Sequence, residues 1–132
     1  MGTKNQLEWA RMVKGSTYEV TGNCVLVRLS HGRGHRVMVS ETDAHYVLQS
    51  LVAKASSLEA LGEDPVYWAW RQNCGARLYH LYVDERRRLM GNAIVPKPCF
   101  TSDEFMLYLI TLARACDTME YMLTGGDREQ LD

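Results

Sequence analysis

The sequence has no long hydrophobic run and almost no excess of charge of either sign. No window approaches the roughly 18 continuous apolar residues that a membrane-spanning helix needs. Its 15 basic and 16 acidic residues give a net charge of −1, so bulk charge attracts neither nucleic acid nor an anionic membrane. With 46% hydrophobic and 23% charged residues, the composition is that of a globular domain and excludes a disordered chain.

Cysteine pairs of the C-x-x-C type are also missing. The four cysteines, Cys24, Cys74, Cys99 and Cys116, lie far apart, and their spacing matches no zinc ribbon or redox motif. No secretory signal peptide is recognisable at the N-terminus. We therefore expect reduced thiols and a cytoplasmic protein that crosses no membrane.

A recognisable catalytic constellation is absent as well. Ser30 precedes His31, but adjacent residues of a strand face opposite sides of a sheet. Asp43, Asp103 and Glu104 lie at predicted helix starts, where the helix dipole accounts for acidic side chains without a catalytic role. The sequence indicates no enzymatic activity and no cofactor, which favours a protein that acts by binding.

What the sequence does contain is a regular succession of helices and hairpin-connected strands. Helices are predicted over residues 4–14, 40–55 and 101–124, and strands over 16–20, 23–30, 35–40, 66–72, 76–84 and 87–95. The expected fold class is α+β, with an antiparallel sheet of about six strands in the order α-β-β-β-α-β-β-β-α and helices packed mainly on one face. Residues 1–124 are predicted to form a single domain and residues 125–132 a flexible acidic tail.

The helix predicted over residues 101–124 has the strongest signals. Thr101 and Glu104 form a capping-box pattern, and Gly125 is a helix terminator. Apolar residues recur at helical spacing along it: Phe105, Leu109, Leu112, Cys116, Met119 and Leu123. The segment over residues 40–55 shows the same spacing at Ala44, Val47, Leu48, Leu51, Val52 and Ala55.

The stretch SHGRGHR, residues 30–36, lies between two runs of alternating valines and predicts a tight turn. A three-residue loop over residues 32–34 would pair His31 with His35. A two-residue loop would instead set Leu29 opposite Arg36. The three-residue loop is favoured because it places the apolar side chains of both strands on one face, namely Val25, Val27, Leu29, Val37 and Val39.

The same stretch is a candidate ligand site. In the predicted register His31 and His35 stand about 5 Å apart at Cβ, which suits two ligands of one zinc or copper ion. Further ligands are open among Cys24, His45, His80 and Cys99, since no spacing selects one. Arg33 and the exposed backbone N–H groups of the loop also make it a candidate anion site. A plain hairpin turn accounts for the same residues without any ligand.

Tyrosine and methionine are abundant, with seven of each. In a predicted hairpin over residues 66–84, Trp68 and Trp70 face the core, and the other face of the sheet is left without a cover. Tyr, Met and Arg are enriched at protein interfaces. We predict that this second face binds another protein, or a second copy of the chain, through Met38, Tyr67, Leu78 and Tyr82, with Arg71 and Arg88 at the rim.

Nucleic-acid binding is a third hypothesis, based on the consecutive arginines of DERRRLM, residues 84–90. Consecutive strand residues point to alternate faces, and Asp84 and Glu85 cancel much of the local charge. An edge-protecting hairpin tip accounts better for this stretch.

The order of predicted elements resembles that of class I type III secretion chaperones, small dimeric proteins that wrap an extended client segment. With one strand fewer, it also resembles roadblock and profilin-like domains. The resemblance concerns architecture, because fold does not carry function. We expect a non-enzymatic, homodimeric chaperone, adaptor or inhibitor that binds a partner protein, with a ligand- or metal-binding domain using the His31–His35 hairpin as the alternative.

Overall fold

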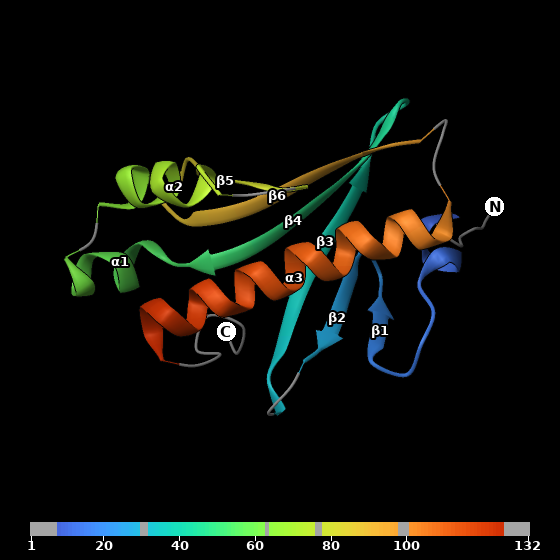
Figure 1. Cartoon of the computed structure of the whole chain (residues 1–132), viewed down its shortest axis with the longest axis horizontal. Helices are drawn as coiled ribbons and strands as arrows, with labels where there is room; N and C mark the ends of the chain where they lie inside the picture. Colours follow the sequence, from blue (N-terminus) through green and yellow to red (C-terminus); the bar gives the residue numbers. More distant parts are fainter. Residues whose placement is uncertain (1–7, 30–31, 63, 76–77, 98–100, 126–132) are drawn as a thin grey trace.

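The structure is a computed structural model that describes residues 8–29, 32–62, 64–75, 78–97 and 101–125. It contains a six-stranded antiparallel sheet with the strand order β1-β2-β3-β4-β6-β5, which confirms the predicted α+β class (Figure 1). The strands are β1 (Tyr18–Thr21), β2 (Cys24–Arg28), β3 (Gly34–Glu41), β4 (His45–Ala53), β5 (His80–Val83) and β6 (Leu89–Pro96). The helices are a 3-10 helix η1 (Glu8–Met12), α1 (Ala55–Leu61), α2 (Pro65–Asn73) and α3 (Ser102–Thr124).

Helix α3 crosses one face of the twisted sheet and forms most of its cover (Figure 1). It begins at the predicted capping box, where Glu104 N–H donates to Thr101 Oγ1 and Thr101 N–H donates to the Glu104 carboxylate. It ends at Gly125, which adopts the left-handed conformation (φ 84°). All six residues of the predicted apolar stripe are buried: Phe105, Leu109, Leu112, Cys116, Met119 and Leu123. None of the helices in the part of the chain that the structure describes is long and apolar enough to span a membrane.

The prediction of an amphipathic helix over residues 40–55 is wrong. Residues 45–53 form the central strand β4, which pairs with β3 and β6. Val47 and Leu51 are half-buried on the face away from α3. A strand with apolar residues on both faces imitates helical spacing, which explains the error. The residues of β4 that face α3 alternate and are buried: Tyr46, Leu48, Ser50 and Val52.

The prediction of a strand over residues 66–72 is also wrong, because this segment forms the helix α2. Asp64 is its N-cap and accepts the N–H groups of Val66 and Tyr67, and Pro65 occupies the first turn. The predicted hairpin with residues 76–84 therefore does not exist. Strand β5 pairs with β6 instead.

The C-terminal end of α2 covers the outer edge of β5. The Asn73 side chain accepts the N–H of Leu81 at 2.7 Å and donates to its carbonyl at 2.9 Å. These two bonds replace the pairing that another strand would supply. The helix thereby protects one edge of the sheet from association with other chains.

The N-terminal helix predicted over residues 4–14 is reduced, in the described residues, to η1. Its Trp9 is buried and stacks on Phe105 of α3, with ring centroids 6.3 Å apart. Residues 4–7 of the predicted helix, and residues 126–132 of the predicted tail, lie outside the described residues.

The β2–β3 hairpin is shifted by four residues from the predicted register, which would pair Val27 with Val39. Val27 lies opposite His35, and Arg28 opposite Gly34, so His35 does not pair with His31, which lies outside the described residues. Because the shift is even, each side chain keeps its predicted face. The valines of both strands are buried beneath α3 as predicted: Val25, Val27, Val37 and Val39.

Candidate functional site

The six predicted interaction residues lie on two parts of the surface, not on one sheet face. Tyr67 and Arg71 are on α2, and Leu78 lies in the segment between α2 and β5, where it adopts a left-handed φ of 68°. These three are therefore not sheet residues, in contrast to the prediction. Met38, Tyr82 and Arg88 do lie on or beside the face of the sheet opposite α3, which we call the open face: Met38 is on β3, Tyr82 on β5, and Arg88 immediately before β6.

The open face contains a hollow of about 480 Å³ whose lining includes Met38, Gln49, Leu51, Met90 and Arg88. Strand register explains this grouping, because Met38 pairs with Gln49 and Leu51 pairs with Met90. The Met38 side chain is 44% exposed. The open face thus presents flexible apolar side chains around a polar centre.

Tyr82 and Arg88 are held beside this hollow by hydrogen bonds. Gln49 Nε2 donates to Tyr82 Oη at 2.7 Å, and Arg88 Nε donates to Asp84 Oδ2 at 2.7 Å. Burial by itself would raise the pKa of Asp84, but the hydrogen bonds and charge of Arg88 and the Arg86 N–H lower it below its ordinary value. Burial raises the pKa of Tyr82, and the Asp84 charge adds to this. Both groups therefore keep their ordinary charge states at neutral pH: Asp84 is ionised and Tyr82 is neutral.

The three consecutive arginines, residues 86–88, lie in the turn between β5 and β6. Asp84 accepts the backbone N–H groups of Arg86 and Arg88, which closes the loop between β5 and β6. The segment is thus a hairpin turn in which the charge of Arg88 is matched by Asp84. Nucleic-acid binding through it stays a prediction.

Helix α2 presents a second apolar surface, formed by Val66, Tyr67 and Trp70, which we call the α2 patch. Their exposed fractions are 62%, 55% and 62%. The rings of Tyr67 and Trp70 lie 6.0 Å apart, and the Arg71 guanidinium stands 5.8 Å from the Tyr67 ring. Trp70 was expected in the core of a strand. As a helical residue it instead faces outward, four positions after Val66.

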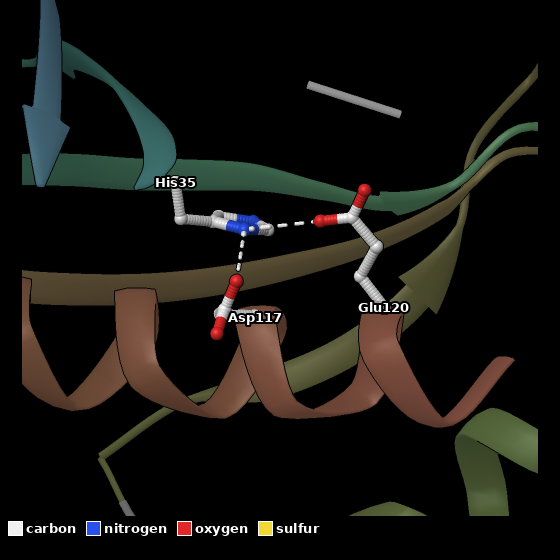
Figure 2. A group of neighbouring side chains, drawn as sticks. All are labelled: His35, Asp117 and Glu120. Atoms are coloured by element: carbon white, nitrogen blue, oxygen red, sulfur yellow. Dashed lines mark ion pairs between the residues drawn. The ribbon is translucent and has the colours of Figure 1, made fainter. Parts of the chain in front are cut away.

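His35 lies in the core, where the structure places it against two acidic residues of α3. His35, Asp117 and Glu120, the buried cluster, have side chains that are 0–2% exposed. His35 Nδ1 is 3.5 Å from Glu120 Oε1 and 3.9 Å from Asp117 Oδ1 (Figure 2). The other ring nitrogen, Nε2, lies 3.0 Å from the Leu51 carbonyl. A carbonyl only accepts, so Nε2 carries a proton.

Arg33, the middle residue of the predicted loop over residues 32–34, borders this cluster. Its Nε donates to Asp117 Oδ2 at 2.8 Å, and its guanidinium lies 5.1 Å from the Tyr121 ring. Arg33 and His35 thus both contact acidic residues of α3, and anion binding by the loop stays a prediction.

Of the further candidate ligands, those that the structure describes, Cys24, His45 and His80, do not join His35 in a cluster. Among the described residues, the one group with metal-ligand spacing is the buried cluster. Cys24 is on the open face, His45 and His80 are exposed on other strands, and Cys99 lies outside the described residues. The sequence did contain a signal for the new partners, because Asp117 and Glu120 are spaced i, i+3 beside the apolar stripe of α3.

The described cysteines are free thiols: Cys24 is half-buried, Cys74 exposed and Cys116 buried. Burial raises the pKa of the Cys116 thiol to about 12, and the neighbouring charges of Glu120 and Asp117 also raise it. Cys116 is therefore a neutral core residue, as its place in the stripe predicted.

Comparison with known proteins identifies the fold. No protein-family model and no curated protein sequence matches the chain. The structure is similar to a chain of the heterodimeric complex ExoU–SpcU from the type III secretion system of Pseudomonas aeruginosa, with a TM-score of 0.56 and 16% identity over 76% of this chain and 84% of that chain. It is also similar to a chain of the ExsC–ExsE complex, with a TM-score of 0.55 and 16% identity over 76% of this chain and 75% of that chain. At this identity the likeness shows the shared fold.

Proposed function

We propose that this protein is a non-enzymatic, chaperone-like binding protein that acts in the cytoplasm as a homodimer and holds an apolar segment of another protein. The observation that carries the proposal is the α2 patch, three large apolar side chains that are each more than half exposed on one short helix. Exposed apolar clusters of this kind mark interaction surfaces. The similar structures are both complexes of two proteins, which supports a partner-binding role.

The chemistry of the α2 patch fits an interface between two copies of the chain. Tyrosine, tryptophan and arginine are the residues most often found at energetic centres of interfaces, and the patch combines Tyr67 and Trp70 with Arg71. A symmetric dimer brings the same patch together with itself. The aromatic rings would then bury each other's exposed faces.

The partner protein would bind at the open face, which the proposed dimer leaves uncovered. The lining of its hollow includes Met38, Leu51 and Met90 among polar residues, and methionine adapts to apolar partners of irregular shape. Arg88, oriented by Asp84, lies at its rim. This arrangement suits an extended apolar segment laid across the strands.

We expect Trp70→Glu to weaken dimerisation by about 30-fold or more, the effect typical of a hot-spot residue. Sedimentation velocity over a concentration series measures the dissociation constant. The matched control is Leu107→Glu, which adds the same charge at a half-exposed position of α3. A wild-type protein that is monomeric throughout, or two variants that behave alike, would refute the assignment of this surface.

Binding of the other protein is tested by a photo-crosslinking amino acid at position 38, introduced into the protein in its native cells. We expect one discrete crosslinked species, identified by mass spectrometry, because Met38 is exposed in the hollow. The same amino acid at position 107 is the control and should give no such species. Identical products at both positions, or none at position 38, would contradict binding at the open face.

A further inference from the structure

The buried cluster has a feature that neither the fold nor partner binding explains. His35 Nδ1 and Asp117 Oδ1 are completely buried, and neither has a hydrogen-bond partner. Such atoms are costly in a core unless something compensates for their lost hydration. With Nε2 directed at the Leu51 carbonyl, Nδ1 points toward the Asp117 and Glu120 carboxylates. In the neutral imidazole, its lone pair would face two negatively charged groups.

Two cations would resolve this arrangement, a proton on Nδ1 or a metal ion, and the distances discriminate between them. A charged N–H donor usually approaches a carboxylate oxygen to about 2.7–2.9 Å, whereas Nδ1 is 3.5 and 3.9 Å from the two oxygens. Ligands that share a tetrahedral zinc ion at about 2.1 Å lie about 3.4 Å from one another. The Glu120 oxygen already matches this spacing, and the Asp117 oxygen needs to move about 0.5 Å closer.

We propose that His35 Nδ1, Asp117 Oδ1 and Glu120 Oε1 bind one zinc ion that joins β3 to the C-terminal half of α3. One ligand atom from each of the three side chains lies within 4.8 Å of the other two, and imidazole with carboxylates is a donor set that zinc accepts. Three protein ligands leave the fourth position for water.

The groups around these ligands have the form of a metal site. His35 Nε2 donates to the Leu51 carbonyl, which fixes the tautomer that presents Nδ1 to the ion. Arg33 holds Asp117 Oδ2, which leaves Oδ1 turned toward His35. The two acidic ligands are one turn apart on a single helix, so their relative position is rigid.

The test uses the full chain, stripped with a chelator and then titrated with Zn²⁺ alone while native mass spectrometry counts bound ions. We expect one zinc per chain, with affinity reduced at least tenfold in Asp117→Asn and Glu120→Gln. The matched control is His80→Gln, which removes an exposed histidine of the open face and should bind zinc as the wild type does. Replacement of zinc by Co²⁺ should give the visible absorption of a tetrahedral site in wild type and control, and not in Glu120→Gln.

A folded wild-type protein that binds no zinc, or binds it equally in Glu120→Gln, would overturn the proposal and leave a protonated His35 as the cation. Circular dichroism shows whether the variants fold. If Asp117→Asn and Glu120→Gln both fail to fold, hydrogen exchange of the wild-type protein is measured with and without zinc. We then expect zinc to slow exchange in β3 around His35 and in α3 around Asp117, and unchanged exchange in both segments would refute the site. Dimerisation and crosslinking at position 38 do not enter this test, so its outcome is independent of the proposed function.

Discussion

Gly91→Ala is expected to lower the free energy of unfolding by about 2–3 kcal/mol, the usual cost of forcing an extra carbon into a packed core. Gly91 lies on β6 beneath α3. A methyl group there would overlap Cys116 Sγ and lie 3.0 Å from Leu112 Cδ1. The glycine therefore sets how closely α3 approaches the sheet. Urea denaturation followed by circular dichroism measures the change.

A double mutant separates this overlap from any effect on strand propensity. Cys116→Ala removes the sulfur, so Gly91→Ala should cost at least 1 kcal/mol less in that background than in the wild type. Gly75→Ala is the control, because a methyl group there meets nothing within 4 Å, and it should change stability by less than about 0.5 kcal/mol. Additive effects of the two core substitutions would mean that the helix is not held against the sheet at this point.

Asp117→Leu is expected to destabilise the protein by about 3 kcal/mol, because it leaves Arg33 without the carboxylate that Nε contacts at 2.8 Å. The Asp117 side chain is only 2% exposed and that of Arg33 28%, so water replaces little of the lost interaction. Urea denaturation in the presence of a chelator measures this effect for the protein's own charges, independently of any bound metal.

Replacing both members of the Arg33–Asp117 ion pair by apolar residues tests whether the unpaired charge causes the loss of stability. Arg33→Met with Asp117→Leu removes both charges and should recover most of the stability, since apolar replacements of a buried ion pair are often neutral. The control is Arg28→Ala, which breaks the Arg28–Glu19 pair, whose side chains are more than half exposed. Its expected cost is about 0.5 kcal/mol or less. A double mutant no more stable than Asp117→Leu would show that the loss comes from packing.

The sequence by itself determined the elements whose signals are local and agree with one another. In α3, the Thr101–Glu104 capping box, the apolar stripe and Gly125 all indicate the same helix, and the structure has it at the predicted bounds. The alternating valines of residues 25–39 likewise determined which side chains face the core. The register shift of four residues is even and leaves that alternation intact.

Two segments have an ambiguous local pattern, and the structure differs from the prediction in both. In β4, apolar residues on both faces of a central strand gave helical spacing. In α2, Trp68 and Trp70 suggested alternation, although Asp64 and Pro65 form a helix N-terminus. Pairing with β3 and β6 decides the first case. In the second, the N-cap and the packing of α2 against β5 outweigh strand propensity.

Only the tertiary structure decided what His35 and the aromatic residues do. His35 was predicted as one of two ligands at a hairpin rim, but the register places it inside the ladder opposite Val27. Its neighbours Asp117 and Glu120 are more than 80 positions away in the sequence, and only the crossing of α3 over β3 brings them together. Local spacing determines which side of an element a residue occupies. The residues that it meets depend on how the elements pack, because contacts between distant segments leave no periodic trace in one sequence.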